Sequence, residues 1–230
     1  MTTQWNRLGA RMAASLVLSL LVPIAGATAA HAAVSTPARW KSISSPGGGV
    51  TCAVSATGQI WCWGLAERQR GVAWLPDDGD SNTTGDGPAA GTQVAPMRVG
   101  TASDWVKVEV GIDHACGLNT KTEIWCWGDN ATGELGQGTS VASRVPVRVP
   151  LPVNGWTDLS VGADITCGLR QGSVWCWGDN NYSQLFPAVS AGPVLSPRMF
   201  DGDLTGQISF LSAGTRVCVI KQDGSAWCVY

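Results

Sequence analysis

Four pairs of cysteines recur along the chain in a shared sequence context, and this repeat constrains the fold more than any other feature. The second cysteine of each pair lies at position 62, 126, 176 or 228, so successive units are 64, 50 and 52 residues apart. Three of these cysteines lie between tryptophans, in WCWG at 61–64 and in WCWGDN at 125–130 and 175–180. A period of about 50 residues is typical of β-propeller blades and other repeat arrays.

Each unit is predicted to form short strands separated by turns. WVKVEV (105–110) and WTDLSV (156–161) alternate between apolar and polar residues, as half-buried strands do. HACGL and ITCGL are expected second strands, and EIWCWG and SVWCWG are expected third strands. VPVRV (145–149) is bounded by proline, which suits an outer strand. No helical period follows residue 33, so the sequence predicts an all-β fold.

The spacing within a pair predicts which cysteines face each other. If Gln171 and Gly172 form a two-residue hairpin turn, counting outward pairs Cys167 with Cys176 at a non-hydrogen-bonded position. Cα atoms at such a position are about 4.5 Å apart, which a disulfide can just bridge. The other pairs have one more intervening residue, which a bulged turn absorbs. The expected disulfides are Cys52–Cys62, Cys116–Cys126, Cys167–Cys176 and Cys218–Cys228.

A metal site and a thiol redox site are the alternatives to disulfides. Structural zinc sites use close pairs such as C-x2-C, whereas cysteines within these pairs are nine or ten positions apart. A redox site uses C-x-x-C near a helix, and the sequence has no such motif. The spacing therefore favours disulfides, and we expect no bound metal and no cofactor.

The tryptophans follow from the same alternation. In IWCWG the two indoles point to one face of the strand and the cysteine to the other. A strand with large apolar groups on one face and a disulfide on the other is buried on both sides, as a propeller blade between two neighbours is. We therefore expect these tryptophans in the core, with sugar binding as the alternative role.

The first 32 residues have the organisation of a secretory signal peptide. Arg7 and Arg11 precede an apolar stretch, and AHA at 30–32 is a small-x-small cleavage pattern; an uncleaved membrane anchor is the alternative. Cleavage after Ala32, with cleavage after Ala29 as the alternative, removes both arginines and no acidic residue, so the net charge changes from −2 to −4. Neither value provides a basic surface for nucleic acid. Secretion agrees with disulfides, and we expect no membrane span in 33–230.

The repeats resemble those of the regulator-of-chromosome-condensation family, whose pattern is roughly G-x-x-H-x-x-A/G-L, a glycine turn, then W-G-x-N-x-x-G-Q-L-G-x-G. The third unit matches in part, with QLFPAVSAG in place of QLGxG, and the fourth matches weakly. The second unit matches at Gly111, His114, Gly117, Leu118, Trp127, Gly128, Asn130, Gly133, Leu135, Gly136 and Gly138. The resemblance implies a β-propeller with four-stranded blades, usually about seven. The paired-cysteine form is similar to secreted bacterial members, including propeller-type β-lactamase inhibitory proteins.

The chain has fewer units than the resemblance implies. We divide 33–230 into units of about 37–100, 101–150, 151–202 and 203–230, and we expect β-propeller blades in an incomplete or truncated propeller. The fourth unit stops after its third predicted strand. This leaves an unpaired edge through which chains could self-associate.

Catalysis has little support in the sequence. His114 is the one histidine after residue 32, and the resemblance implies a structural, hydrogen-bonding role for it. Asp113 is adjacent, and neighbouring strand residues point to opposite faces. No paired-carboxylate, phosphate-loop or nucleotide motif is present. We therefore expect no catalytic residues.

Recognition is expected in the loops, because loops carry binding residues on rigid scaffolds. The first unit has an insertion at 65–93, whose acidic stretch DDGDSNTTGD lacks the glycine and the final glutamate of a calcium loop, so we expect no metal there. The candidate binding residues of this insertion and of the third unit are Trp74, Asp78, Asp80, Tyr182 and Phe186.

These observations predict a secreted, non-catalytic module that binds an extracellular protein, with inhibition of an extracellular enzyme as one form of that binding. That expectation rests on analogy with secreted family members, and fold constrains function only weakly. The alternatives are a cell-surface or carbohydrate-binding propeller and, with less support, a hydrolase.

Overall fold

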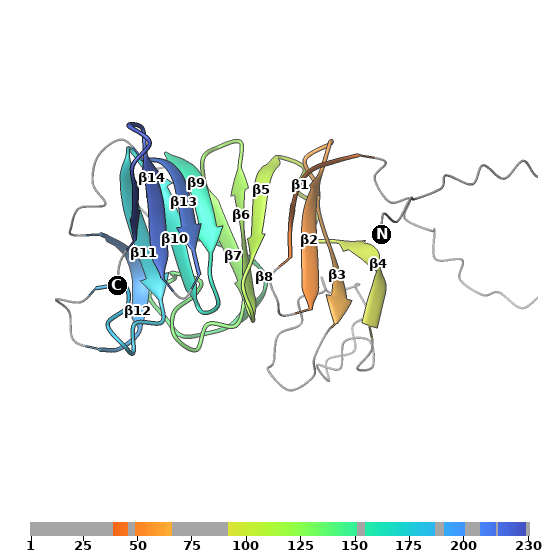
Figure 1. The fold of residues 1–230 in the computed structure, drawn as a ribbon. Helices are drawn as coiled ribbons and strands as arrows, with labels where there is room; N and C mark the ends of the chain where they lie inside the picture. The colour runs from red at the N-terminus through yellow and green to blue at the C-terminus, as the bar shows by residue number, and fades with distance from the viewer. Residues whose placement is uncertain are drawn as a thin grey trace, which may run out of the picture. The chain divides into compact units, whose positions relative to one another are not determined.

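The computed structural model confirms the all-β prediction and shows four antiparallel sheets arranged as propeller blades (Figure 1). The structure describes residues 39–45, 49–65, 92–150, 155–186, 191–200, 208–214 and 216–228. The predicted signal peptide lies outside these residues. A compact unit comprises Thr36–Tyr230.

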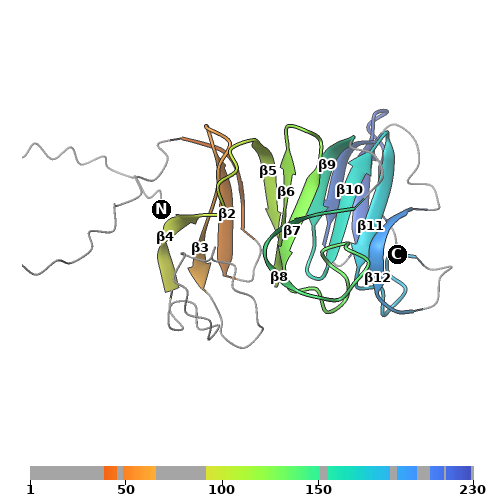
Figure 2. The same cartoon turned by 180° about the vertical axis from the view of Figure 1, so that it is seen from behind.

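The strands are consecutive in sequence within every sheet (Figures 1 and 2). The first sheet has β1 (Trp40–Ser44), β2 (Val50–Ser55), β3 (Ile60–Leu65) and β4 (Thr92–Arg98). The second has β5 (Trp105–Val110), β6 (His114–Asn119), β7 (Ile124–Gly128) and β8 (Ser143–Arg148). The third has β9 (Trp156–Val161), β10 (Ile165–Arg170), β11 (Ser173–Gly178) and β12 (Val194–Met199). The fourth has β13 (Ile208–Ala213), β14 (Val217–Lys221) and β15 (Ala226–Cys228).

Proline lies in the fourth strand of each of the first three sheets, at Pro96, Pro146 and Pro197. These strands pair on one side only, in the sheet order that places each at an edge. Proline has no N–H to donate, so it is tolerated there.

The hairpins hold the cysteines opposite each other in the register that the spacing predicts. Cys167 pairs with Cys176 across a turn whose central residues Gln171 and Gly172 have φ of 50° and 74°, as a type I′ turn requires. In the hairpins with one more residue, the same register is restored by a positive-φ residue four positions before the second cysteine. These residues are Gly58, Thr122 and Gly224.

All four disulfides are formed in the pairs expected from the spacing, with Cα–Cα distances of 4.0–4.1 Å. Each joins two neighbouring strands of one sheet. A closed loop of this size stabilises the folded state by about 2–3 kcal/mol when chain entropy alone is counted.

The core lies between successive sheets, because cysteines and tryptophans point to opposite faces. Cys116 and Cys126 of the second sheet pack with Trp156 and Leu159 of the third. Trp127, on the other face of the second sheet, packs with the disulfide and aliphatic residues of the first. The second sheet is therefore buried on both sides, as predicted for a blade between two neighbours.

The first strands of successive sheets contact one another, since β1 contacts β5, β5 contacts β9, and β9 contacts β13. The third strands are followed by a loop at 129–142 in the second sheet and by residues 179–186 in the third sheet. These segments and the first and second strands of both sheets contain most of the residues considered below.

Candidate functional site

Two of the candidate binding residues lie in the described part of the chain, and they differ in their exposure to solvent. Tyr182 is 88% exposed, and its ring extends from the loop after β11. Phe186 is 4% exposed and packs on Phe200, with ring centroids 5.4 Å apart. Phe186 is therefore a core residue that secures the loop, which corrects its prediction as a binding residue. Trp74, Asp78 and Asp80 lie outside the described residues.

A buried asparagine fixes the loop that carries Tyr182. The Asn180 side chain is fully buried, and its Oδ1 accepts hydrogen bonds from the backbone N–H groups of Leu185 (2.8 Å) and Phe186 (3.1 Å). The backbone N–H of Tyr182 donates to Oε1 of Gln184 at 2.9 Å. The exposed ring therefore projects from a loop whose backbone is held on both sides.

The second sheet contains the same anchor. Asn130 is fully buried, its Oδ1 accepts from the N–H of Leu135 at 2.9 Å, and its Nδ2 donates to the carbonyls of Thr139 and Val141. The repeated motif WCWGDN contains both asparagines, but the motif alone does not show that they anchor loops. The signal that could have shown this role is that each asparagine lies at the same distance in sequence from the second cysteine of its pair.

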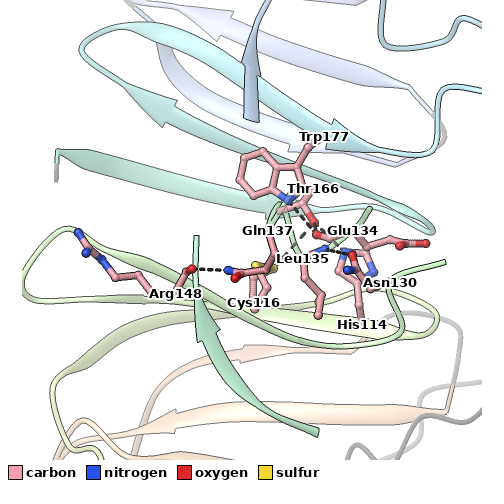
Figure 3. The surroundings of a disulfide bond; sticks show 10 residues. His114, Cys116, Asn130, Glu134, Leu135, Gln137, Arg148, Thr166 and Trp177 are labelled. Carbon is pink, nitrogen blue, oxygen red and sulfur yellow. Dashed lines mark hydrogen bonds between the residues drawn. A yellow bond between two sulfur atoms is a disulfide. The ribbon is translucent and has the colours of Figure 1, made fainter. Parts of the chain in front are cut away.

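The loop of the second sheet is tied to the third sheet by a buried network (Figure 3). The carbonyl of Glu134 accepts from Trp177 Nε1 at 2.8 Å and from Thr166 Oγ1 at 3.0 Å. His114 Nε2 lies 2.7 Å from Thr166 Oγ1. Because the hydroxyl proton is used toward Glu134, the imidazole is the donor in this contact. Gly136 admits the indole, since a Cβ there would lie 2.9 Å from Trp177 Nε1.

His114 is held in its neutral form. Its side chain is 1% exposed, and burial lowers its pKa from 6.5 to about 3. A fully buried imidazole cannot reach a substrate at the surface, so the residue acts through packing and its hydrogen bond to Thr166. The structure thus gives His114 the structural position that the resemblance implies.

A charged cluster joins the first strands of the second and third sheets. Lys107 Nζ lies 2.8 Å from Asp158 Oδ1, 3.2 Å from Glu109 Oε1 and 2.7 Å from the carbonyl of Leu159. Ser44 of the first sheet donates to Glu109 Oε2 at 3.1 Å. Burial by itself lowers the pKa of Lys107, but hydrogen bonds and the two negative charges outweigh it and raise that pKa above 10.5. Sequence reasoning missed this cluster, because its members are about 50 residues apart.

The ammonium group of Lys107 donates to Asp158 and to the carbonyl of Leu159 and forms an ion pair with Glu109, so it joins the second and third sheets. Among the described residues, no group of three or more His, Cys, Asp or Glu side chains is placed to hold a metal ion. The calcium-like stretch of the first unit lies outside those residues. Within the same described part of the chain, no helix is long and apolar enough to cross a membrane.

Four antiparallel sheets that pack face to face, with loops anchored by repeated asparagines, define a repeat protein of the β-propeller class. Models of the Regulator of chromosome condensation (RCC1) repeat match residues 123–169 and, for a second form of the repeat, residues 105–134 and 156–184. The part of the chain within 105–184 therefore matches RCC1 repeats, in agreement with the resemblance seen in its sequence.

Three known proteins show how far the likeness extends. The RCC1 domain-containing protein RUG3, mitochondrial, of Arabidopsis thaliana is 28% identical over 100 residues, which are 44% of this chain and 21% of that protein. The crystal structure of human WBSCR16 matches with a TM-score of 0.64 at 18% identity, over 78% of this chain and 44% of the other. Prp20p from Saccharomyces cerevisiae matches with a TM-score of 0.63 at 20% identity, over 79% of this chain and 41% of the other. The chain spans less than half the length of these proteins, and the structural likeness shows the fold alone.

Proposed function

We propose that the chain is a secreted, non-catalytic propeller module that binds an extracellular protein through the loop surface around Tyr182. The observation that carries this proposal is a nearly fully exposed tyrosine on a loop held by buried hydrogen bonds to Asn180. Tyrosine is enriched among the residues that dominate protein interfaces. A loop that is already ordered loses little conformational entropy when it binds.

Three further observations support the proposal. The structural relative Prp20p is described as binding Gsp1p and histones, which are proteins. His114 is buried and neutral, so it is unsuited to act as a base at the surface. The four disulfides and the organisation of residues 1–32 agree with export. Inhibition of an extracellular enzyme is one form that such binding could take.

Site-specific photo-crosslinking tests the binding surface. A benzophenone amino acid at position 182 should join the mature protein to one discrete protein from the culture medium of the producing cells. The matched control is the same label at Val145, which is 57% exposed on the outer strand β8. Equal labelling from both positions, or retention on a glycan array instead of on a protein, would contradict the proposal.

Secretion is tested separately. Protein recovered from the medium should begin at Ala33, as determined by amino-terminal sequencing. Cell-associated protein that retains residues 1–32 would reject export through a cleaved signal peptide while leaving the binding surface to its own test.

A further inference from the structure

The fourth disulfide differs from the others in its exposure. Cys218 is half-buried and Cys228 is exposed. The six cysteines of the first three sheets each have 0% exposure: Cys52, Cys62, Cys116, Cys126, Cys167 and Cys176. A thiol in solution can therefore reach one of the four disulfides without any opening of the protein.

Packing explains this difference. The Cys167–Cys176 disulfide lies in one cluster with Leu211 and Val219 of the following sheet, which cover it. On the fourth sheet, Phe210 pairs with Ile220, and two positions along the strand Cys218 pairs with Cys228. These pairs share one face, because residues two apart along a strand point the same way.

Neighbouring side chains confirm that this face is open. Phe210 is 52% exposed and Ile220 is 39% exposed. The equivalent face of the third sheet is buried against β13 and β14. The accessibility of the disulfide is therefore a property of the whole face and not of one rotated side chain.

We propose that Cys218–Cys228 is a thiol–disulfide exchange site, with accessible thiols as its substrate class. The thiolate of the incoming molecule attacks Sγ of Cys228, which is the more exposed residue of the pair. A mixed disulfide forms at Cys228, the Cys218–Cys228 bond breaks, and Cys218 leaves as a thiolate. A second thiol then attacks the mixed disulfide, which releases the oxidised form of the small molecule and the Cys228 thiolate. Two thiols thus supply the two electrons. Exposed disulfides are the labile ones in proteins, whereas covered ones resist reduction.

The hairpin around this disulfide is held by bonds other than the disulfide itself. Asp223 Oδ1 accepts from the N–H of Ser225 at 2.9 Å and from its hydroxyl at 2.6 Å. The N–H of Lys221 donates to the carbonyl of Ser225 at 2.9 Å. The reduced cysteines are therefore kept across from each other, and exchange is reversible when the thiol is removed.

Timed alkylation of the folded, oxidised protein tests the proposal. The protein is incubated with reduced glutathione in native buffer, quenched with N-ethylmaleimide at intervals, and mapped by non-reducing peptide mass spectrometry. Cys218 and Cys228 should become labelled at least about tenfold faster than any other cysteine, because covered pairs require local opening first. The glutathione adduct should be found on Cys228, and removal of glutathione in air should restore the disulfide.

Two controls make the outcome decisive. In urea sufficient to unfold the chain, all four disulfides should react at similar rates. The double variant Cys218→Ser and Cys228→Ser should lose the fast phase and retain the slow one. A single common rate in native buffer, a different pair reacting first, or an adduct found mainly on Cys218 would overturn the assignment. The wild-type measurement decides the matter even if the double variant does not fold.

Discussion

Because His114 is buried in its neutral form, we expect the free energy of unfolding to decrease as the pH falls from 7 to 5. The pKa of this imidazole is about 3 in the folded protein and close to 6.5 when the chain is unfolded. Between these values the unfolded state binds a proton that the folded state does not. The contribution of neutral His114 to the free energy of unfolding is therefore fully present above pH 6.5 and decreases as the pH falls below that value.

The expected magnitude follows from linkage. At pH 5 the unfolded imidazole is almost fully protonated and the folded one almost fully neutral, so the free energy of unfolding is lower than at pH 7 by about 2 kcal/mol. The slope approaches about 1.4 kcal/mol per pH unit below pH 6, as expected for one proton.

The matched variant is His114→Gln, which keeps an N–H donor for Thr166 Oγ1 and has no titratable group. Its stability at pH 7 should be lower by about 1 kcal/mol because the side chain packs differently. Its decrease between pH 7 and 5 should be smaller than that of the wild type by about 2 kcal/mol. Urea unfolding with intact disulfides, followed by circular dichroism at both pH values, measures the difference.

Other titrating groups contribute to both proteins and cancel in this comparison. Burial raises the pKa of Glu134, which favours the folded state as the pH falls and so opposes the effect of His114. Hydrogen bonding from Asn119 lowers the pKa of Glu123, which acts in the same direction as His114. If the stability difference between wild type and variant changes by less than about 0.5 kcal/mol from pH 7 to 5, the imidazole is not held neutral as argued.

Three further predictions concern the junctions between sheets. Trp177→Phe should lower the free energy of unfolding by about 1–3 kcal/mol, because it leaves the carbonyl of Glu134 with one donor fewer. Trp127→Phe is its matched control and should cost less, because Trp127 Nε1 has no hydrogen-bond partner in the described part of the chain. A change of equal size in both variants would assign the effect to packing. Gly168→Ala should cost about 1–3 kcal/mol, since the added Cβ would lie 2.5 Å from an indole ring, and a neutral result in thermal unfolding would contradict that contact. Lys107→Met should cost about 1 kcal/mol, because it leaves two carboxylates near each other, and high salt should reduce the loss.

The sequence predicts the fold well because its strongest signals are local. The register of the third hairpin follows from a turn of two residues and from the alternation of a strand, and both are fixed within ten positions of Cys167. The outer strand around Pro146 is equally local. The sheet order also follows from short connections, since consecutive strands of a repeat pair with one another.

The candidate site was harder to predict because its contacts are distant in sequence or made by the backbone. Lys107 and Asp158 are 51 residues apart, and no local pattern links them. The carbonyl of Glu134 is the acceptor for Trp177, and a carbonyl has no sequence signature. The sequence predicts Phe186 as a binding residue because loops carry recognition on rigid scaffolds, but its burial and its contact with Phe200 place it in the core.

The three-part network of Glu134, Thr166 and Trp177 explains why similar repeats can form unlike junctions. The residue before the first cysteine is Thr166 in the third unit but Ala115 in the second, and alanine has no hydroxyl to donate. The indole that corresponds to Trp177 is Trp127, whose Nε1 is buried and has no acceptor among the residues that the structure describes. The junction between the second and third sheets is therefore held by directed hydrogen bonds, whereas Trp127 at the preceding junction contributes through packing with the first sheet. Because packing is tolerant of changes in shape and directed bonds are not, sequence change is expected to be less restricted at position 127 than at position 177.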